Sequence, residues 1–152
     1  MSAPSNVSGD LIWEVVRNNN AFIVKRNSGG GVQFSRDPFN LTNKHSRKHA
    51  GFVNNKAVSI QANEKGGVTL QTKKSGSSNK PASQYNSHAF GKTTSNRKIY
   101  KSVADAVGKR SYRGDLNKDA VARASAIRDS QRVKKDTPAR KPRGAKASKT
   151  EA

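Results

Sequence analysis

The sequence contains no cysteine. This absence excludes disulfide bonds, zinc sites with thiolate ligands and a cysteine nucleophile. Large apolar residues are also scarce, because Leu, Ile, Val and Phe make up only about a sixth of the chain. A highly charged chain with less than roughly 20% of these residues is expected to be disordered. No apolar run reaches the roughly 18 residues of a transmembrane helix. We therefore expect a small folded part with long solvated extensions and no membrane-spanning segment.

Acidic residues are few as well. Only 10 Asp and Glu residues stand against 30 Lys and Arg residues among 152, so the formal net charge is +20. The excess is uneven: residues 71–152 carry most of it, whereas residues 1–70 hold most of the large apolar side chains. This asymmetry predicts a core in the N-terminal half and a nucleic-acid-binding extension in the C-terminal half.

The N-terminal half shows the patterns of one helix and four strands. Residues 11–18 place their apolar side chains on an arc of about 200° when drawn as a helix, and Ser8 or Asp10 suits its start as an N-cap. Strands are expected at 21–26 and 32–35, around a glycine turn, and at 57–62 and 68–72, where apolar and polar residues alternate. A short loop joins the last two strands, which predicts a hairpin.

The C-terminal half has weaker patterns. Residues 73–97 are rich in Ser, Asn, Lys and Gly and lack periodicity, so we expect a segment that is ordered only by a partner. Two apolar stripes at helical spacing then predict two helices, the second capped by Asp115; the stripes are Ile99, Val103 and Val107, followed by Leu116, Ala120, Ala124 and Ile127.

The expected fold class is α+β: an N-terminal helix, a small, mainly antiparallel four-stranded sheet, two C-terminal helices and disordered basic extensions. Residues 8–72 would form a small α+β module, and 73–97 an extended basic linker. Residues 98–132 would form a two-helix RNA-binding extension, and 133–152 a basic tail with two prolines.

Patterns of catalytic or metal sites are weak. Gly91-Lys92-Thr93-Thr94 ends like a phosphate-binding P-loop, but the glycine that the motif needs five residues earlier is Asn86, and no strand is expected before it. His45 and His49 have a spacing of four, but His88 is distant and cysteine is absent, so a metal site lacks ligands. The carboxylates are scattered. We expect no enzyme activity, no cofactor and no bound metal.

The basic residues carry the functional signal. A cluster in the loop between the expected strands lies near Phe39 and Phe52, and further cations run through segments too polar to pack alone. We expect direct RNA contact from these side chains, since Lys and Arg neutralise phosphates and release counterions; the alternative is a solvated loop that the two phenylalanines anchor to the core. The candidates are Lys44, His45, Arg47, Lys48, His49, Lys73, Lys74, Lys80, Arg97, Lys98, Lys101, Lys109, Arg110, Arg113, Arg123, Lys134 and Lys135.

Several of these stretches resemble one known family. The matching stretches are residues 11–16, 18–20 and 22–25, then 32–35 and 48–51, then 58–62, 112–116 and 122–127. Together they resemble the eukaryotic large-subunit ribosomal protein family called L-twenty-eight, over about residues 8–135. The family's Tyr-Arg-Pro-Asp-Leu motif matches Tyr112-Arg113-Gly114-Asp115-Leu116, except that Gly114 replaces the proline.

The resemblance implies a structural role without catalysis. A protein of this family would be a constituent of the cytosolic large ribosomal subunit, bound to its ribosomal RNA and to neighbouring ribosomal proteins. It would work in cytoplasmic ribosomes after transit through the nucleus and nucleolus, with no membrane and no small-molecule substrate as partner. The alternatives are a ribosome-biogenesis factor that shares the N-terminal module, a chromatin-type basic DNA-binding protein and an RNA-processing enzyme.

Overall fold

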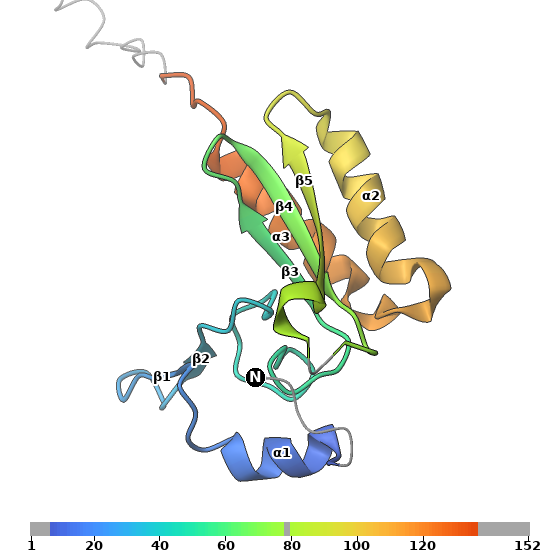
Figure 1. Ribbon diagram of the computed structural model, residues 1–152. Coiled ribbons are helices and arrows are strands. Elements are labelled where there is room, and N and C mark those ends of the chain that lie inside the picture. The colour runs from blue at the N-terminus through green and yellow to red at the C-terminus, as the bar shows by residue number, and fades with distance from the viewer. Residues whose placement is uncertain (1–6, 78–79, 137–152) are drawn as a thin grey trace, which may run out of the picture.

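The computed structural model describes residues 7–77 and 80–136. Figure 1 shows a sheet with two long helices on one side, and a separate N-terminal part formed by a helix and a short two-stranded ribbon. The expected tail therefore lies largely outside the described residues, apart from residues 133–136. Within the described part, no helix is long and apolar enough to cross a membrane.

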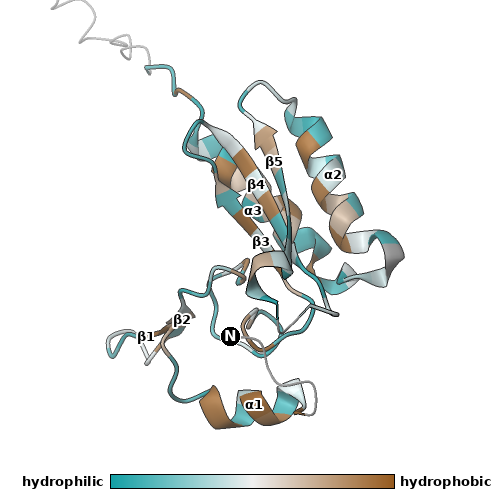
Figure 2. Cartoon of the chain, viewed as in Figure 1, coloured by the Kyte–Doolittle hydropathy of each residue, from teal (hydrophilic) through white to brown (hydrophobic). Residues whose placement is uncertain are grey.

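The N-terminal helix α1 (Gly9–Val16) was predicted from its apolar arc. The hydroxyl of Ser8 accepts a hydrogen bond from the Leu11 amide at 3.3 Å, which confirms Ser8 as the N-cap. None of the helix residues is buried: Leu11 is 59% exposed and Val15 is 73% exposed. Figure 2 shows the apolar residues of α1 in brown, and Ile12, Trp13 and Val16 among them are partly buried.

The strands form two sheets in the described part of the chain, not the single four-stranded sheet that the sequence predicted. Strands β1 (Ile23–Lys25) and β2 (Gln33–Ser35) pair antiparallel as a ribbon. Its turn contains three glycines with positive φ, a region that glycine enters without strain. Strands β3 (Val58–Ala62), β4 (Gly67–Lys73) and β5 (Tyr85–Gly91) form an antiparallel sheet with β4 in the middle.

Strand β5 is the main departure from the sequence expectation, because it lies in the segment predicted to be an extended linker. It pairs with β4 along the full length of both strands, from Gly67 opposite Gly91 to Lys73 opposite Tyr85. Only Phe90 of β5 is buried, so the strand has no apolar alternation that a sequence pattern could show. The short helix η1 (Pro81–Ser83) precedes it.

Helices α2 (Asn96–Gly108) and α3 (Asn117–Ser130) pack together, and α3 also contacts β3 and β4. The short helices η2 (Lys109–Ser111) and η3 (Gly114–Leu116) connect them. Asp115 does not cap α3, since its carboxylate instead binds Arg113. The core joins the sheet to both helices: Leu41, Val58, Ile60, Val68, Leu70, Phe90, Ile99, Val103, Val107, Leu116, Ala120 and Ala124.

This composition of the core corrects the predicted division into an N-terminal core and a C-terminal charged extension. Ile99, Val103 and Val107 are fully buried, as the helical spacing indicated. They complete one core with β3 and β4, so the two C-terminal helices are part of the folded body and not an appendage. Some of the apolar residues near the start of the sequence, such as Leu11 and Val15, lie in α1 and are exposed, so they do not contribute to this core.

Candidate nucleic-acid interface

The basic loop at residues 36–56 is held in shape by buried polar side chains. The Asp37 carboxylate accepts hydrogen bonds from the amides of Phe39 and Phe52, both at 3.0 Å. Asn40 is 1% exposed and bonds to Lys44 and Thr42 of the same loop. Because these local bonds replace strand pairing, a loop without secondary structure presents its cations in a defined arrangement.

Two aromatic residues of this loop pack inside the protein. Phe39 stacks on Tyr85 with ring centroids 5.0 Å apart, and Phe52 lies 5.4 Å from Phe22. They are half-buried, which agrees with the anchoring role considered for them. The exposed phenylalanine of this region is Phe34 on β2, at 40% exposure, which bridges to the backbone of Lys44.

The five candidate residues of the loop have different surroundings. Lys44 and Lys48 are exposed, and Lys48 lies 3.8 Å from Asp119. Arg47 is engaged by Asp10 at 2.8 Å and by Asn54, so it ties the loop to α1. His45 contacts the Arg17 carbonyl at 2.6 Å, and its ring lies tilted against that of Trp13 with centroids 5.0 Å apart. Lys44 and Lys48 are thus the exposed side chains among these five candidates.

His49 belongs to a chain of three polar side chains. Its Nδ1 lies 2.9 Å from the Ser46 hydroxyl, and its Nε2 lies 3.0 Å from the Asp119 carboxylate. These residue types occur in hydrolases, but there the serine meets Nε2 and the acid meets Nδ1, the reverse of this arrangement. In the described part of the chain, no group of three His, Cys, Asp or Glu side chains could hold a metal. The hydrogen bonds among Ser46, His49 and Asp119 instead attach the basic loop to α3.

Three other candidate cations are used inside the protein. Lys73 is 6% exposed and donates to the carbonyls of Gly51 and Asn54 at 2.9 and 3.2 Å. Burial lowers the pKa of Lys73, and the nearby Asp37 carboxylate partly opposes this shift. Its ammonium group crosslinks β4 to the basic loop, so we leave it out of the interface.

Arg113 and Arg123 act in the same way. Arg113 donates to the carbonyls of Lys56 and Lys48, both at 3.0 Å, and pairs with Asp115 at 2.9 Å. This arginine is the main reason that the pKa of Asp115 is lowered. Arg123 donates to the carbonyls of Ile60 and Leu41, both at 3.0 Å. The guanidinium groups connect C-terminal elements to the backbone of the N-terminal half.

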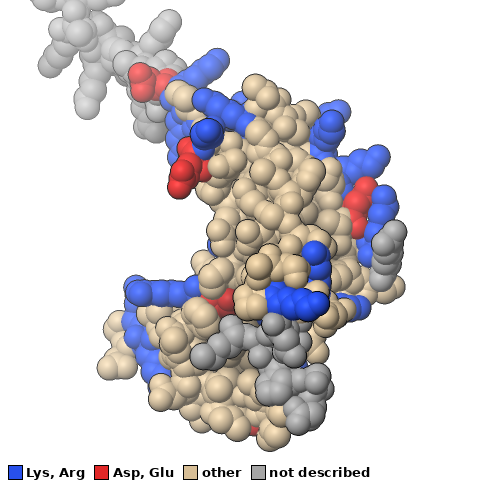
Figure 3. Space-filling view, in the orientation of Figure 1, with Lys and Arg blue, Asp and Glu red and all other residues tan. Residues whose placement is uncertain are grey.

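The remaining candidates are at the surface. Lys74 is half-buried, whereas Lys80, Arg97, Lys98, Lys101, Lys109, Lys134 and Lys135 are exposed. Arg110 lies in η2, but its side chain is outside the described part of the structure. Figure 3 shows Lys and Arg at the end of the β3–β4 hairpin, along α2 and around the β1–β2 ribbon.

The sequence patterns did not predict that one group of cations lies together. Lys65, Lys92, Arg128 and Arg132 line a cavity of about 730 Å³ where the β3–β4 turn, the end of β5 and the end of α3 meet. They are separated by up to 67 positions along the chain, and no run of charge links them. Only the fold brings them together.

Comparison with known proteins gives a consistent result. Residues 11–130 match the model of the Ribosomal L28e protein family. The chain is 48% identical to the large ribosomal subunit protein eL28 of Schizosaccharomyces pombe, over 86% of this chain and 97% of that protein. It is 36% identical to eL28 of Trypanosoma cruzi (91% and 89% covered) and 34% identical to eL28 of Caenorhabditis elegans (85% and 94%). The match spans the helices, the sheet and the basic loop, and the chain belongs to the Ribosomal L28e protein family.

Proposed function

We propose that this protein is a structural constituent of the cytosolic large ribosomal subunit that binds and bridges ribosomal RNA without catalysis. The observation that carries the proposal is the family match over residues 11–130. The net charge of +20 supports it, because a polyanion neutralises charges that repel one another in the free protein.

The exposed cations form the interface of this proposal. The interface contains Lys80 just before η1, Arg97, Lys98 and Lys101 in α2, Lys109 in η2, Lys44 and Lys48 in the basic loop, and Lys134 and Lys135 at the end of the described chain. Figure 1 shows α2, the basic loop and the end of the described chain at different places in the fold, so the protein would contact more than one RNA segment. Such contacts recognise the shape of the phosphate backbone and not the base sequence.

Hydrogen bonds from three internal cations hold the elements that carry this interface in a fixed arrangement. Lys73, Arg113 and Arg123 bind backbone carbonyls across the fold and hold the loop on the sheet and helices. The exposed cations beside them then lose less side-chain and loop freedom on binding, which strengthens association. Neighbouring ribosomal proteins would be further partners, and the exposed apolar residues of α1 offer a surface for one.

Sedimentation tests the proposal. The tagged protein, expressed in eukaryotic cells, should co-sediment with large subunits and translating ribosomes in a sucrose gradient. Nuclear transit would appear as a short-lived nucleolar signal that precedes the cytoplasmic one. A protein found only in the chromatin fraction would support the DNA-binding alternative, and one found only with nucleolar precursor particles would support the biogenesis-factor alternative.

Charge variants on α2 test whether its exposed cations contact RNA phosphates. Replacing Arg97, Lys98 and Lys101 together by Gln should release the protein from subunits at lower salt, with a salt slope smaller by about 2 to 3 units. The matched control exchanges the same residues as Arg97→Lys, Lys98→Arg and Lys101→Arg. It keeps the charge and should be retained like the parent.

A further inference from the structure

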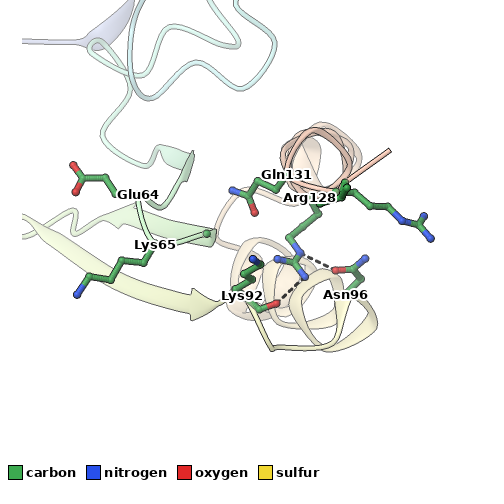
Figure 4. A pocket seen from close by; sticks show the side chains of 9 residues that line it. Glu64, Lys65, Lys92, Asn96, Arg128 and Gln131 are labelled. Atoms are coloured by element: carbon green, nitrogen blue, oxygen red, sulfur yellow. Dashed lines mark hydrogen bonds between the residues drawn. The ribbon is translucent and has the colours of Figure 1, made fainter. Parts of the chain in front are cut away.

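The cavity at the end of the sheet is built from three parts of the chain. Lys65 and Gly66 come from the β3–β4 turn, Lys92 from the connection after β5, and Asn96 from the start of α2. Arg128 lies in the last turn of α3, and Arg132 follows that helix. Four cations and one carboxylate, Glu64, line it. In Figure 4, Glu64 extends away from Arg128, so it does not pair with the least exposed of the four cations.

The walls of the cavity are fixed by hydrogen bonds. Arg128 donates to the Asn96 side chain at 2.8 Å and to the Lys92 carbonyl at 3.1 Å (Figure 4). The Gln131 amide binds both the N–H and the carbonyl of Gly67, at 2.9 and 2.8 Å, which joins α3 to the start of β4. These bonds hold the positive groups together before any ligand arrives, so little ordering is needed on binding.

The stem of Lys92 is held as well. Gly66 has a φ of +81°, and a side-chain carbon at this position would lie 3.3–3.4 Å from three carbons of the Lys92 stem. The stem therefore lies across a turn that has no side chain of its own. The ammonium group projects from this position while Lys92 as a whole remains exposed.

The connection that carries Lys92 resembles part of a P-loop. Gly91-Lys92-Thr93-Thr94 lacks a glycine that the motif needs, and no strand was expected before it. The second expectation is wrong, because β5 ends at Gly91 and α2 begins at Asn96. The missing glycine and the antiparallel sheet still exclude a nucleotide-binding P-loop. The loop nevertheless runs from a strand to a helix start, where Ser95 makes no side-chain capping bond, so first-turn amides are available to an anion.

The cavity continues into a groove along the two helices. A second hollow shares Asn96, Arg128 and Arg132 with it, and a third shares Tyr100, Ala122 and Ser125 with the second. The small side chains of Ala122 and Ser125 let a ligand come close to α3, and Lys118 lines the far end. The second hollow is also lined by the Asp129 carboxylate, beside Arg128 and Arg132. An extended polyanion with phosphates near Arg128, Arg132 and Lys118 fits this series of hollows, whereas an isolated ion would occupy only the first.

From these observations we propose that the cavity binds a backbone phosphate of ribosomal RNA, and that the strand continues along the groove between α2 and α3. Lys92, Arg132 and the first turn of α2 would contact the phosphate, and Arg128 would position the loop that carries Lys92. This proposal rests on the proposed function and assigns a place to one of its RNA contacts. It names a site outside the basic loop and outside the exposed face of α2.

Lysine reactivity in native particles tests the site. Large subunits and the free full-length protein are treated with an acetylating reagent, and the modified lysines are identified by mass spectrometry. Lys92 is exposed in the protein alone, so it should react readily there, several-fold less in subunits, and readily again after ribonuclease digestion. Lys73 is buried and should be unreactive in the free protein too, which makes it an internal control.

The possible results separate this inference from the function on which it rests. Protection of Lys98 and Lys101 without protection of Lys92 would overturn the cavity proposal and leave the function standing. Equal reactivity of all exposed lysines in subunits and free protein would overturn both. Protection of Lys92 that survives ribonuclease would show a protein occupant and would also overturn the proposal.

Variants add a second measurement. Lys92→Gln with Arg132→Gln should lower the salt slope of release from subunits by about one unit, as expected for one lost phosphate contact. The charge-retaining pair Lys92→Arg and Arg132→Lys should be released at the same salt as the parent. Arg128 is left unchanged because its loss would move the loop. An unchanged salt slope for the Gln pair would contradict the proposal.

Discussion

Replacing Arg123 by Met gives the sharpest test of how this protein uses its charge. Sequence reasoning placed Arg123 among the RNA contacts. In the structure its guanidinium donates to the carbonyls of Ile60 and Leu41, both at 3.0 Å, and more weakly to the Asn43 side chain at 3.3 Å. Met keeps an unbranched stem for packing but removes every donor.

The expected loss follows from the two backbone bonds. Each contributes about 1 kcal/mol net, and somewhat more because the donor is charged. Arg123 is half-buried, so water replaces part of what the variant loses, and the Asn43 contact is exposed. We expect the free energy of unfolding to fall by about 2 kcal/mol. For a chain of this size, that loss corresponds to a decrease in Tm of about 4–8 °C.

Thermal unfolding of the full-length protein, followed by far-ultraviolet circular dichroism, measures this loss. Arg123→Lys should fall between the parent and Arg123→Met, because one ammonium group does not span both carbonyls with the planar fork of arginine. Lys118→Gln removes an exposed charge from the same helix and should leave the Tm unchanged. The reasoning is refuted if Arg123→Met unfolds at the temperature of the parent but leaves RNA at lower salt.

Three further predictions concern the core, a buried hydroxyl and a turn. Ile99→Ala, at a fully buried position, should lower the unfolding free energy by about 2–5 kcal/mol. Val15→Ala on the exposed α1 should change it by less than about 0.5 kcal/mol. If both variants lose similar stability in urea denaturation, the assignment of Ile99 to the core and Val15 to the surface is wrong. Tyr112→Phe should cost about 1–2 kcal/mol, since the hydroxyl bonds to Ala57 and to the Lys73 carbonyl at 2.6 Å. Burial raises the pKa of Tyr112 above 10.0. The stability that the hydroxyl contributes is therefore present below pH 10.0 and is lost as the pH rises through the folded-state pKa. The difference in unfolding free energy between parent and variant should shrink in alkali, and a constant difference would contradict the shift. Gly67→Ala should destabilise strongly, because its φ is +103° and the added carbon would lie 2.1 Å from the Phe90 carbonyl oxygen; Gly76→Ala, which meets nothing within 4 Å, is the control in the same melting experiment.

Local patterns predicted the parts of the fold that local forces decide. The alternation at 57–62 and 68–72 matches strands β3 and β4, which pair in the register Val58 opposite Thr72 to Ala62 opposite Val68. The spacing of Ile99, Val103 and Val107 matches the buried face of α2. The Ser8 cap also follows from its neighbours alone. In each of these cases, the residues that determine the element lie within one or two turns or strands of each other.

The features that were missed depend on distant partners. Strand β5 has one buried side chain, and its order comes from backbone pairing with β4, which a pattern of side chains does not report. The buried position of Lys73 depends on the Gly51 and Asn54 carbonyls, 19 to 22 positions away. The sequence prediction placed Lys73 among the RNA contacts, because the sequence alone does not show the acceptors that compensate the cost of burying a charge.

For the candidate interface, the sequence shows which residues are charged but not which of them are exposed and which bind acceptors within the protein. Lys44, Lys48 and the α2 cations are exposed, as an RNA-facing role requires. Arg47, Arg113 and Arg123 have internal acceptors. Lys92 lies in a short stretch that resembles the end of a P-loop, but no local pattern placed it beside Arg132, since the two meet only when β5 and α3 are in place.

The division between arginine and lysine explains how so thin an apolar core supports a folded body. Arg113, Arg123 and Arg128 each donate to two or more acceptors from other elements, and most of these acceptors are backbone carbonyls. A planar guanidinium suits several fixed acceptors at once, whereas an ammonium group on a flexible stem suits a solvated phosphate. The arginine crosslinks therefore add stability where apolar burial is limited, and most exposed lysines remain available to RNA. The internal arginines keep their charge, so they still raise the positive potential of the surface. Counting basic residues thus describes the overall charge of this protein, while the fold shows which of them bind its own acceptors and which are exposed.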